Sequence, residues 1–308
     1  MSFLKFILLF IIIFIFASCS KSKKLHVFEF QFFKMDTDLL VKYVAQKRNF
    51  KMEKEIKEYI NRFDRENSFY KKESFLSQIN KLKNNESLEV PHYFCKMLEM
   101  SANYNKTTEN RFNIAYKSPG EYRNFNNLQI SCKNDVVKVN KKGTILDTGG
   151  IAKGYSIDET GNILKKYGYK NFIVNYGGDM LVCGKKNNHK SWVIGIKSPF
   201  DKYKILKKIS KNIKNCYAVA TSGDYKRYIV KEGKKYSHII DPKTGLSVKG
   251  AHSVTVIADN ATKADVLATA ISVGNKDAGY IKRMKKKFKI EIYMLRGKNY
   301  KQYSLFVE

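Results

Sequence analysis

The chain has 308 residues, with 58 Lys and Arg against 28 Asp and Glu, so its formal net charge is +30. Apolar residues make up 43% of the chain and aromatic residues 13%, which is the composition of a folded protein and excludes a disordered basic tail. Fifty of the 58 cationic residues are Lys and eight are Arg, whereas recognition of base edges and phosphates favours Arg. We therefore interpret the charge as a Lys-rich coating over the whole chain and expect no nucleic-acid partner.

The amino terminus predicts export across a membrane. After the single charge of Lys5, an apolar run of 12 residues covers 6–17, which is too short to span a bilayer but fits the core of a signal peptide. The run leads into Phe16-Ala17-Ser18-Cys19, which resembles the lipobox of bacterial lipoproteins. Residues 1–18 are therefore expected to be a signal peptide, Cys19 the lipidated residue and 19–24 a tether, with an uncleaved membrane anchor as the alternative. Both interpretations place the protein at the extracytoplasmic (periplasmic) face of a bacterial membrane.

The remaining residues, 25–308, are expected to form a single domain because no linker or internal repeat interrupts them. In chain order, apolar spacing predicts a strand at 25–33, an amphipathic helix through Met52 and Phe63, and a helix after Pro91. Further strands are expected at 128–132, 136–140, 172–175, 192–197, 217–221, 228–230 and 253–258, then helices at 263–273 and 277–287, and finally terminal strands. Strands outnumber helices and many lie at hairpin spacing, so the predicted fold class is α+β, with mixed or antiparallel sheets and packed helices.

Four cysteines follow the predicted lipidation site, namely Cys95, Cys132, Cys183 and Cys216. They lie far apart, without the C-x-x-C or Cys/His spacing of a zinc site or a redox pair. The favoured interpretation is that they are buried free thiols, with disulfide pairing left open.

A glycine pair marks the first segment with functional potential. Gly149 and Gly150 open a turn at the start of a helical pattern, where free backbone N–H groups and the charge of Lys153 could face an anion. Glycine pairs also commonly end a strand, so this pattern alone leaves both interpretations open.

Two later segments carry polar residues with functional potential, one after apolar strands and one on a predicted helix. Residues 236–245 bring His238 and Asp241 to the end of a predicted strand, although the same residues also make a plain turn sequence. Asp265 and Thr269 are four residues apart, so one helix face would carry two hard oxygen ligands suited to Mg²⁺. A capping box of Thr262 with Asp265 is the alternative for this helix.

Five strings occur in the order and approximate spacing of one family: LDTGGIAKGYSID, NFIVNYGGDMLVCG, VATSGDYKRY, YSHIIDPKTG and SVTVIADNATKADVLATA. From about Phe30 to its end the chain resembles the ApbE family of flavin transferases, which are also lipoproteins. The resemblance implies a single ApbE-like domain that binds FAD and Mg²⁺. It implies transfer of FMN through a phosphoester to a threonine of a membrane redox protein, of the sodium-pumping NADH:quinone reductase or Rnf type, with release of AMP.

The resemblance also implies site residues. Asp265, Thr269 and the backbone carbonyl of Gly150 match metal-binding positions of the family. The positions that match flavin-nucleotide contacts are Met35, Tyr70, Arg111, Phe112, Asn113, Asp147, Lys153 and Ile240. One segment departs from the family pattern, because Asn113 stands where Asp is usual and the Gly-Pro that follows is absent or displaced to Pro119-Gly120.

The chemistry requires positive potential at the phosphates and a base for the threonine hydroxyl. Lys153 is expected to supply the first. His238 and Asp241 are the candidates for the base, and His238 is favoured because the ordinary pKa of histidine lies near neutral pH. Two other functions remain alternatives: an FAD pyrophosphatase that releases FMN and AMP to water, and a non-catalytic flavin-binding lipoprotein.

Overall fold

The computed structural model describes residues 24–186, 190–198, 200–201, 203–212, 215–223, 228–231, 234–299 and 302–307. The predicted signal peptide and Cys19 lie outside these residues and stay predictions. Within the described residues, no helix has the length and apolar character needed to cross a membrane.

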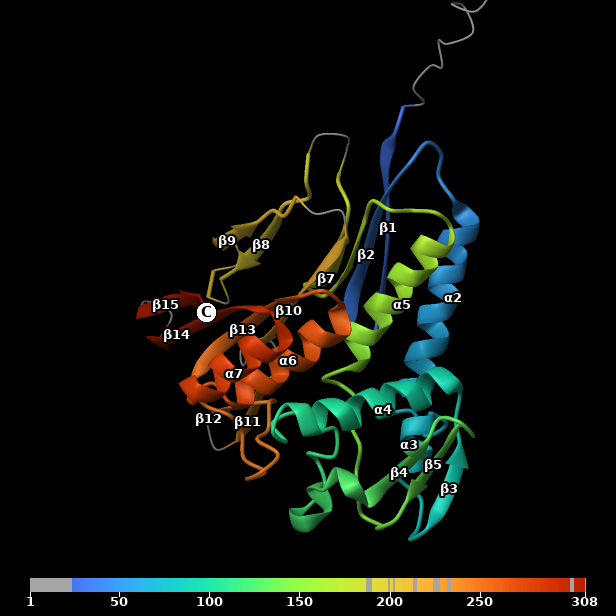
Figure 1. Ribbon diagram of the computed structural model, residues 1–308, viewed down its shortest axis with the longest axis vertical. Coiled ribbons are helices and arrows are strands. Elements are labelled where there is room, and N and C mark those ends of the chain that lie inside the picture. The colour runs from blue at the N-terminus through green and yellow to red at the C-terminus, as the bar shows by residue number, and fades with distance from the viewer. Residues whose placement is uncertain are drawn as a thin grey trace, which may run out of the picture.

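An eight-stranded sheet in which all neighbouring strands are antiparallel forms the centre of the fold (Figure 1). In spatial order its strands are β1 (His26–Lys34), β2 (Thr37–Ala45), β6 (Phe172–Tyr176), β7 (Asp179–Cys183), β10 (Cys216–Gly223), β13 (Ala251–Ala258), β14 (Glu291–Asn299) and β15 (Gln302–Val307). Helices pack against this sheet, and the predicted α+β class is confirmed.

Each face of the large sheet is covered by different elements. One face packs against α2 (Phe50–Asn67), α5 (Ala152–Lys166), α6 (Ala261–Val273) and α7 (Ala278–Phe288) in one apolar cluster. The other face packs against a hairpin of β8 (Ile194–Lys197) and β9 (Ile205–Ile209), with the buried Trp192 beside it. Successive side chains of a strand point to opposite faces, so apolar residues on both faces fit a sheet that is covered on both sides.

A smaller three-stranded sheet lies apart from the large one, in the lower part of Figure 1. Its strands are β3 (Glu86–Glu89), β5 (Val136–Val139) and β4 (Leu128–Ser131), and it shares a second apolar cluster with α3 (Phe75–Ile79) and α4 (His92–Thr107). The short helices η2 (Gly120–Arg123) and η3 (Phe125–Asn127) lead into β4, and the hairpin of β11 (Tyr228–Lys231) and β12 (Lys234–Ser237) completes the fold.

The cysteines correct one expectation. They are not free thiols, because Cys95 is joined to Cys132 and Cys183 to Cys216. Cys183 and Cys216 are direct partners in the register of β7 and β10, and the other disulfide links α4 to the turn after β4. Strand pairing and helix packing bring these residues together over 33 and 37 positions of sequence, a proximity that their spacing alone does not reveal.

Register fixes which end of the large sheet each loop occupies. The β1–β2 turn with Met35 and the β6–β7 turn with Gly177 lie at one end, because Lys34 pairs with Thr37 and Tyr176 with Asp179. The start of β1 lies at the other end, where His26 pairs with Ala45.

Candidate active site

One cavity of about 490 Å³ gathers almost all of the predicted site residues, and its size is typical of small-molecule sites. Its lining includes Met35, Tyr70, Arg111, Phe112, Asn113, Asp147, Gly150, Lys153, His238, Ile240, Asp265 and Thr269. These residues come from the sheet end with the β1–β2 turn, from α5 and the segment before it, from α6, from loops next to α2 and α4, and from the loop after β12. Tertiary packing therefore brings together segments that are up to 234 positions apart, from Met35 to Thr269.

Asp241 is the predicted residue that the cavity lining does not include. Its carboxylate accepts a hydrogen bond from the backbone N–H of Lys243 at 2.9 Å, and its carbonyl accepts one from Gly245 at 2.7 Å. Asp241 therefore builds a turn, as its sequence context also allowed. Among the two candidates for a base, the geometry favours His238, which is exposed and lines the cavity.

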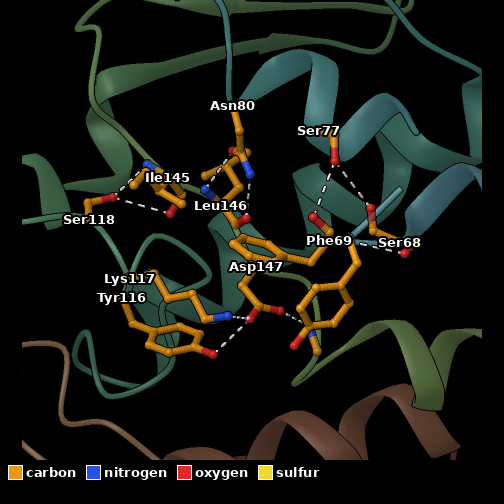
Figure 2. Close-up of polar contacts among 12 residues, drawn as sticks. Ser68, Phe69, Ser77, Asn80, Tyr116, Lys117, Ser118, Ile145, Leu146 and Asp147 are labelled. Carbon is orange, nitrogen blue, oxygen red and sulfur yellow. Dashed lines mark hydrogen bonds and ion pairs between the residues drawn. The ribbon is translucent and has the colours of Figure 1, made fainter. Parts of the chain in front are cut away.

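The segment before the glycine pair is held by side chains rather than by a strand (Figure 2). Asn80 donates to the carbonyl of Leu146 at 2.9 Å and accepts from its N–H at 2.8 Å. Ser118 makes the same pair of contacts with Ile145, accepting from its N–H at 2.7 Å and donating to its carbonyl at 3.2 Å. These four bonds satisfy the backbone of an extended segment and fix the position of Asp147, which follows it.

Asp147 organises the turn that contains the glycine pair. Its Oδ2 accepts a hydrogen bond from the Tyr116 hydroxyl at 2.9 Å and lies 2.7 Å from the Lys117 ammonium, as Figure 2 shows. Its Oδ1 accepts from the N–H of Gly149 at 2.8 Å. The Gly149 N–H is thus already bonded, so the expectation that both glycine amides face an anion is wrong for Gly149. Burial and the nearby Asp147 charge raise the pKa of Tyr116, which keeps this phenol a donor.

Lys153 reaches the cavity wall from the first turn of α5 and forms an ion pair with Asp179. Asp179 is 1% exposed, and its Oδ1 accepts a hydrogen bond from the N–H of Thr221 at 2.9 Å. Asp179 is not among the residues predicted for the site. Its sequence context could have indicated a functional residue, because Asp179 follows the glycine pair Gly177-Gly178 directly after an apolar strand.

The three predicted metal-site residues lie side by side. Asp265 and Thr269 share one face of α6, and a Cβ atom on Gly150 would lie 3.5 Å from the Thr269 Oγ1 and 3.1 Å from the Phe112 ring. Only glycine therefore allows this close approach without movement of its neighbours. Ser222 adds another hydroxyl, with its Oγ 3.2 Å from the Thr269 Oγ1.

Asp265 is a buried carboxylate, 5% exposed, whose Oδ2 accepts a hydrogen bond from the N–H of Gly154 at 2.9 Å. Burial is the main reason that its pKa rises to about 7; Lys153 lowers that pKa and Asp179 raises it. Among the described residues, no group of three or more His, Cys, Asp and Glu side chains is arranged to hold a metal. A metal ion at this place would therefore have one buried carboxylate, hydroxyls, a backbone carbonyl oxygen and oxygens of the enzyme's substrate as ligands.

The start of α6 corrects the capping-box alternative. Asn260 caps the helix by accepting from the N–H of Lys263 at 2.8 Å, and Thr262 does not take this role. Asp158 of α5 instead accepts hydrogen bonds from the N–H groups of Ala261 and Thr262, both at 2.8 Å, and from the Thr262 hydroxyl at 2.6 Å. Asp265 is therefore not used as a cap and is left facing the cavity.

The segment that departs from the family pattern has its own hydrogen bonds. Asn113 donates from Nδ2 to the carbonyl of Arg123 at 2.6 Å and accepts at Oδ1 from the N–H of Ala115 at 2.8 Å. Arg111 lies over the Tyr280 ring at 4.4 Å and pairs with Asp277 at 2.8 Å. The two hydrogen bonds of residue 113 require Asn, because an ionised Asp has no hydrogen to donate to the carbonyl of Arg123.

The chain is similar to known proteins in sequence and in fold. A family model described as the ApbE family matches residues 35–294. The chain is 31% identical over 233 residues to the FAD:protein FMN transferase of Buchnera aphidicola, covering 67% of this chain and 68% of that protein. It is 28% identical over 255 residues to the enzyme of that name from Haemophilus influenzae, covering 74% and 73%. The crystal structure of the ApbE protein from Thermotoga maritima is similar with a TM-score of 0.79 and 29% identity, covering 88% of this chain and 94% of that one. The family match spans every cavity residue named above.

Proposed function

The chain belongs to the ApbE family, and from this premise we propose that it is a Mg²⁺-dependent FAD:protein FMN transferase. Its substrates would be FAD and a threonine hydroxyl of an acceptor protein, and its products a phosphoester-linked FMN on that threonine and free AMP. The observation that carries the proposal is that Lys153, Asp265 and Thr269 line the same cavity as the exposed aromatic ring of Tyr70. Such a cavity offers cationic and oxygen groups for a pyrophosphate and an aromatic surface for a flavin ring.

The residues present fit Mg²⁺. A carboxylate as buried as Asp265 is costly to ionise without a compensating cation, which agrees with its raised pKa. Asp265, the Thr269 hydroxyl and the Gly150 carbonyl would supply hard oxygen ligands, and Mg²⁺ typically takes its other ligands from phosphates and water. When bound, Mg²⁺ supplies Lewis-acid stabilisation of phosphate oxygens.

The side chains of the cavity then have separate tasks. The threonine oxygen forms a new bond to the FMN phosphorus, the P–O bond to the bridging oxygen breaks, and AMP leaves with that oxygen. An imidazole nitrogen of His238 accepts the hydroxyl proton. The Lys153 ammonium, held at the wall by Asp179, adds positive potential where charge builds up on the phosphates.

The disulfides support the proposed location. Disulfides persist in oxidising compartments outside the cytoplasm, and the structure contains two of them. Together with the apolar run and Cys19 they favour a lipid-anchored protein on the periplasmic side of a bacterial membrane. We propose membrane redox subunits of the sodium-pumping NADH:quinone reductase or Rnf type as acceptors.

Mass spectrometry tests the proposal. The purified protein is incubated with FAD, Mg²⁺ and a candidate acceptor, and the acceptor is searched for an FMN adduct on threonine. AMP that appears only when the acceptor is present supports a transferase. AMP released at the same rate without acceptor would instead identify an FAD pyrophosphatase, and bound flavin with no AMP a non-catalytic flavin-binding protein.

A further inference from the structure

The cavity and the start of the described chain lie at opposite ends of the large sheet. Met35 in the β1–β2 turn lines the cavity, whereas His26 begins β1 at the other end and pairs with Ala45. The nine residues of β1 span roughly 30 Å between these ends. In Figure 1 the start of β1 is at the top, beside the loop that leads into α2.

We name this end of the sheet the amino-terminal end and define it by six exposed residues: Leu25, Val27, Lys47, Phe50, Lys51 and Lys170. A hydrogen bond of 2.9 Å from the N–H of Val44 to the carbonyl of Asn171 places the loop with Lys170 beside the end of β2. The apolar side chains are unusually exposed, with Phe50 at 71%, Leu25 at 45% and Val27 at 40%. The amino-terminal end therefore combines cationic and apolar groups.

Phe50 is exposed at the capped start of α2. Asn49 caps α2 by accepting from the N–H of Met52 at 3.0 Å, and Phe50 is the first residue of the helix. Arg48 donates two hydrogen bonds to Glu53, each of 2.9 Å, and its guanidinium carbon lies 5.2 Å from the Phe50 ring. These contacts hold the start of α2 and place the Arg48 guanidinium beside the Phe50 ring, which buries little surface within the protein.

We propose that the amino-terminal end docks on the surface of an anionic bilayer. Phe50, Leu25 and Val27 would contact the boundary between headgroups and acyl chains, while the three lysines face lipid phosphates. The proposal rests on the lipid anchor at Cys19 that belongs to the proposed function. From that cysteine the chain to Lys24 can reach at most about 18 Å, which keeps this end of the protein close to the membrane.

Docking in this orientation directs the cavity away from the bilayer. The acceptor threonine would then have to stand roughly 30 Å from the membrane surface, the length of β1. The partner surface is a lipid headgroup layer, and the acceptor is a segment that projects well beyond it.

A Phe50→Trp variant of the full, lipid-anchored chain tests the docking directly. It is reconstituted in vesicles of phosphatidylcholine alone or with phosphatidylglycerol. The chain has one tryptophan, Trp192, which is 5% exposed, so the wild-type protein gives a constant emission background. We expect the variant's added emission to shift to shorter wavelength only in the anionic vesicles. Equal spectra in both vesicles would overturn the proposal.

Hydrogen exchange supplies the matched comparison. Anionic vesicles should slow exchange several-fold at residues 46–51 of the wild type and leave residues 83–89 unchanged. A variant with Lys47→Gln, Phe50→Ser and Lys51→Gln should lose this protection, whereas Lys81→Gln with Lys83→Gln, exposed at the distant small sheet, should keep it. Protection that is equal in both variants would contradict the assignment of the docking residues.

The docking proposal and the proposed function can be refuted independently of each other. None of the substituted residues lines the cavity, so FMN transfer to a soluble acceptor in detergent should be unchanged in every variant. Absence of transfer in the wild type would refute the proposed function without affecting the vesicle result. The intact mass of the purified protein shows independently whether Cys19 carries lipid.

Discussion

The backbone N–H of Gly154 donates a hydrogen bond to the Asp265 carboxylate, 2.9 Å from N to Oδ2, across a helix contact that has no room for a side chain. A Cβ atom at Gly154 would lie 2.5 Å from the carbonyl oxygen of Ala261 and 2.8 Å from the Asp265 Cβ. Gly154 is therefore required both for the packing of α5 on α6 and for the position of the buried carboxylate.

We expect Gly154→Ala to push α6 away from α5. The overpacking should cost about 1–3 kcal/mol in the free energy of unfolding and should reduce FMN transfer by displacing Asp265. Urea unfolding and an FMN-transfer assay measure the two effects. Gly279→Ala in α7 is the control, since its Cβ would meet nothing closer than 3.4 Å, and it should change neither quantity appreciably. Equal stability of the two variants would contradict the role of Gly154.

The absence of β2 from the predicted strands has a physical explanation. The strand β2 follows a turn in which Met35 and Asp36 both have a φ of 54°, a conformation usually marked by Gly or Asn, and neither residue is present there. Predictions based on periodicity alone, such as the helix at 263–273, agree with α6 to within a few residues. Where a turn is formed by atypical residues, the local sequence does not indicate the turn or the strand that follows it.

The family resemblance indicated residues that the structure places around one cavity, whereas contacts that depend on packing could not be predicted from the sequence. Asp265 and Thr269 share a helix face that their spacing already implies. The ion pair of Lys153 with Asp179 joins α5 to the start of β7, and the contact arises only from the fold. The hydrogen-bonding role of Asn113 is likewise visible only once Arg123 and Ala115 are placed.

Asp265→Asn should change the pH dependence of stability in metal-free buffer. Burial raises the pKa of Asp265 from its ordinary 3.8 to about 7, so between these values the folded protein binds more protons than the unfolded chain. The wild-type free energy of unfolding should therefore fall as the pH rises through this window. Asp265→Asn should lack the contribution of Asp265 to that decline, and its free energy of unfolding should exceed that of the wild type at pH 8.

Added Mg²⁺ completes this test. The cation should raise the unfolding midpoint of the wild type at pH 8 and leave Asp265→Asn unchanged, because a ligand that binds only the folded state stabilises it. FMN transfer should be abolished in the variant. Full transfer activity in Asp265→Asn, or an equal Mg²⁺ effect on both proteins, would refute the metal assignment.

Asn113→Asp restores the residue usual in the family and should nevertheless be destabilising here. The carboxylate would keep the bond from the Ala115 N–H but would face the Arg123 carbonyl without a hydrogen to donate. An unsatisfied buried polar group costs about 1–3 kcal/mol, which denaturant unfolding at pH 7 would reveal. A variant as stable as the wild type would show that this loop rearranges easily.

Removal of the disulfide between Cys95 and Cys132 should destabilise the small sheet. The bond closes a sequence separation of 37 residues, and the double variant Cys95→Ser, Cys132→Ser should lose about 2–4 kcal/mol of unfolding free energy.

Alkylation of unreduced, denatured wild-type protein should label none of Cys95, Cys132, Cys183 and Cys216. Labelling of all four without a reductant would show that the bonds do not form in the cell.

His238→Ala should separate catalysis from binding. If His238 accepts the threonine proton, its loss should lower the rate of FMN transfer by roughly 10²–10⁴-fold while the Kd for FAD changes far less. Single-turnover transfer and flavin-fluorescence titration measure the two quantities. Asp241→Asn is the matched control, because the amide oxygen can still accept from the Lys243 N–H and hold the turn beside the cavity. A loss of FAD affinity as large as the loss of rate would make His238 a binding residue, and a large rate loss in Asp241→Asn alone would move the base to that carboxylate.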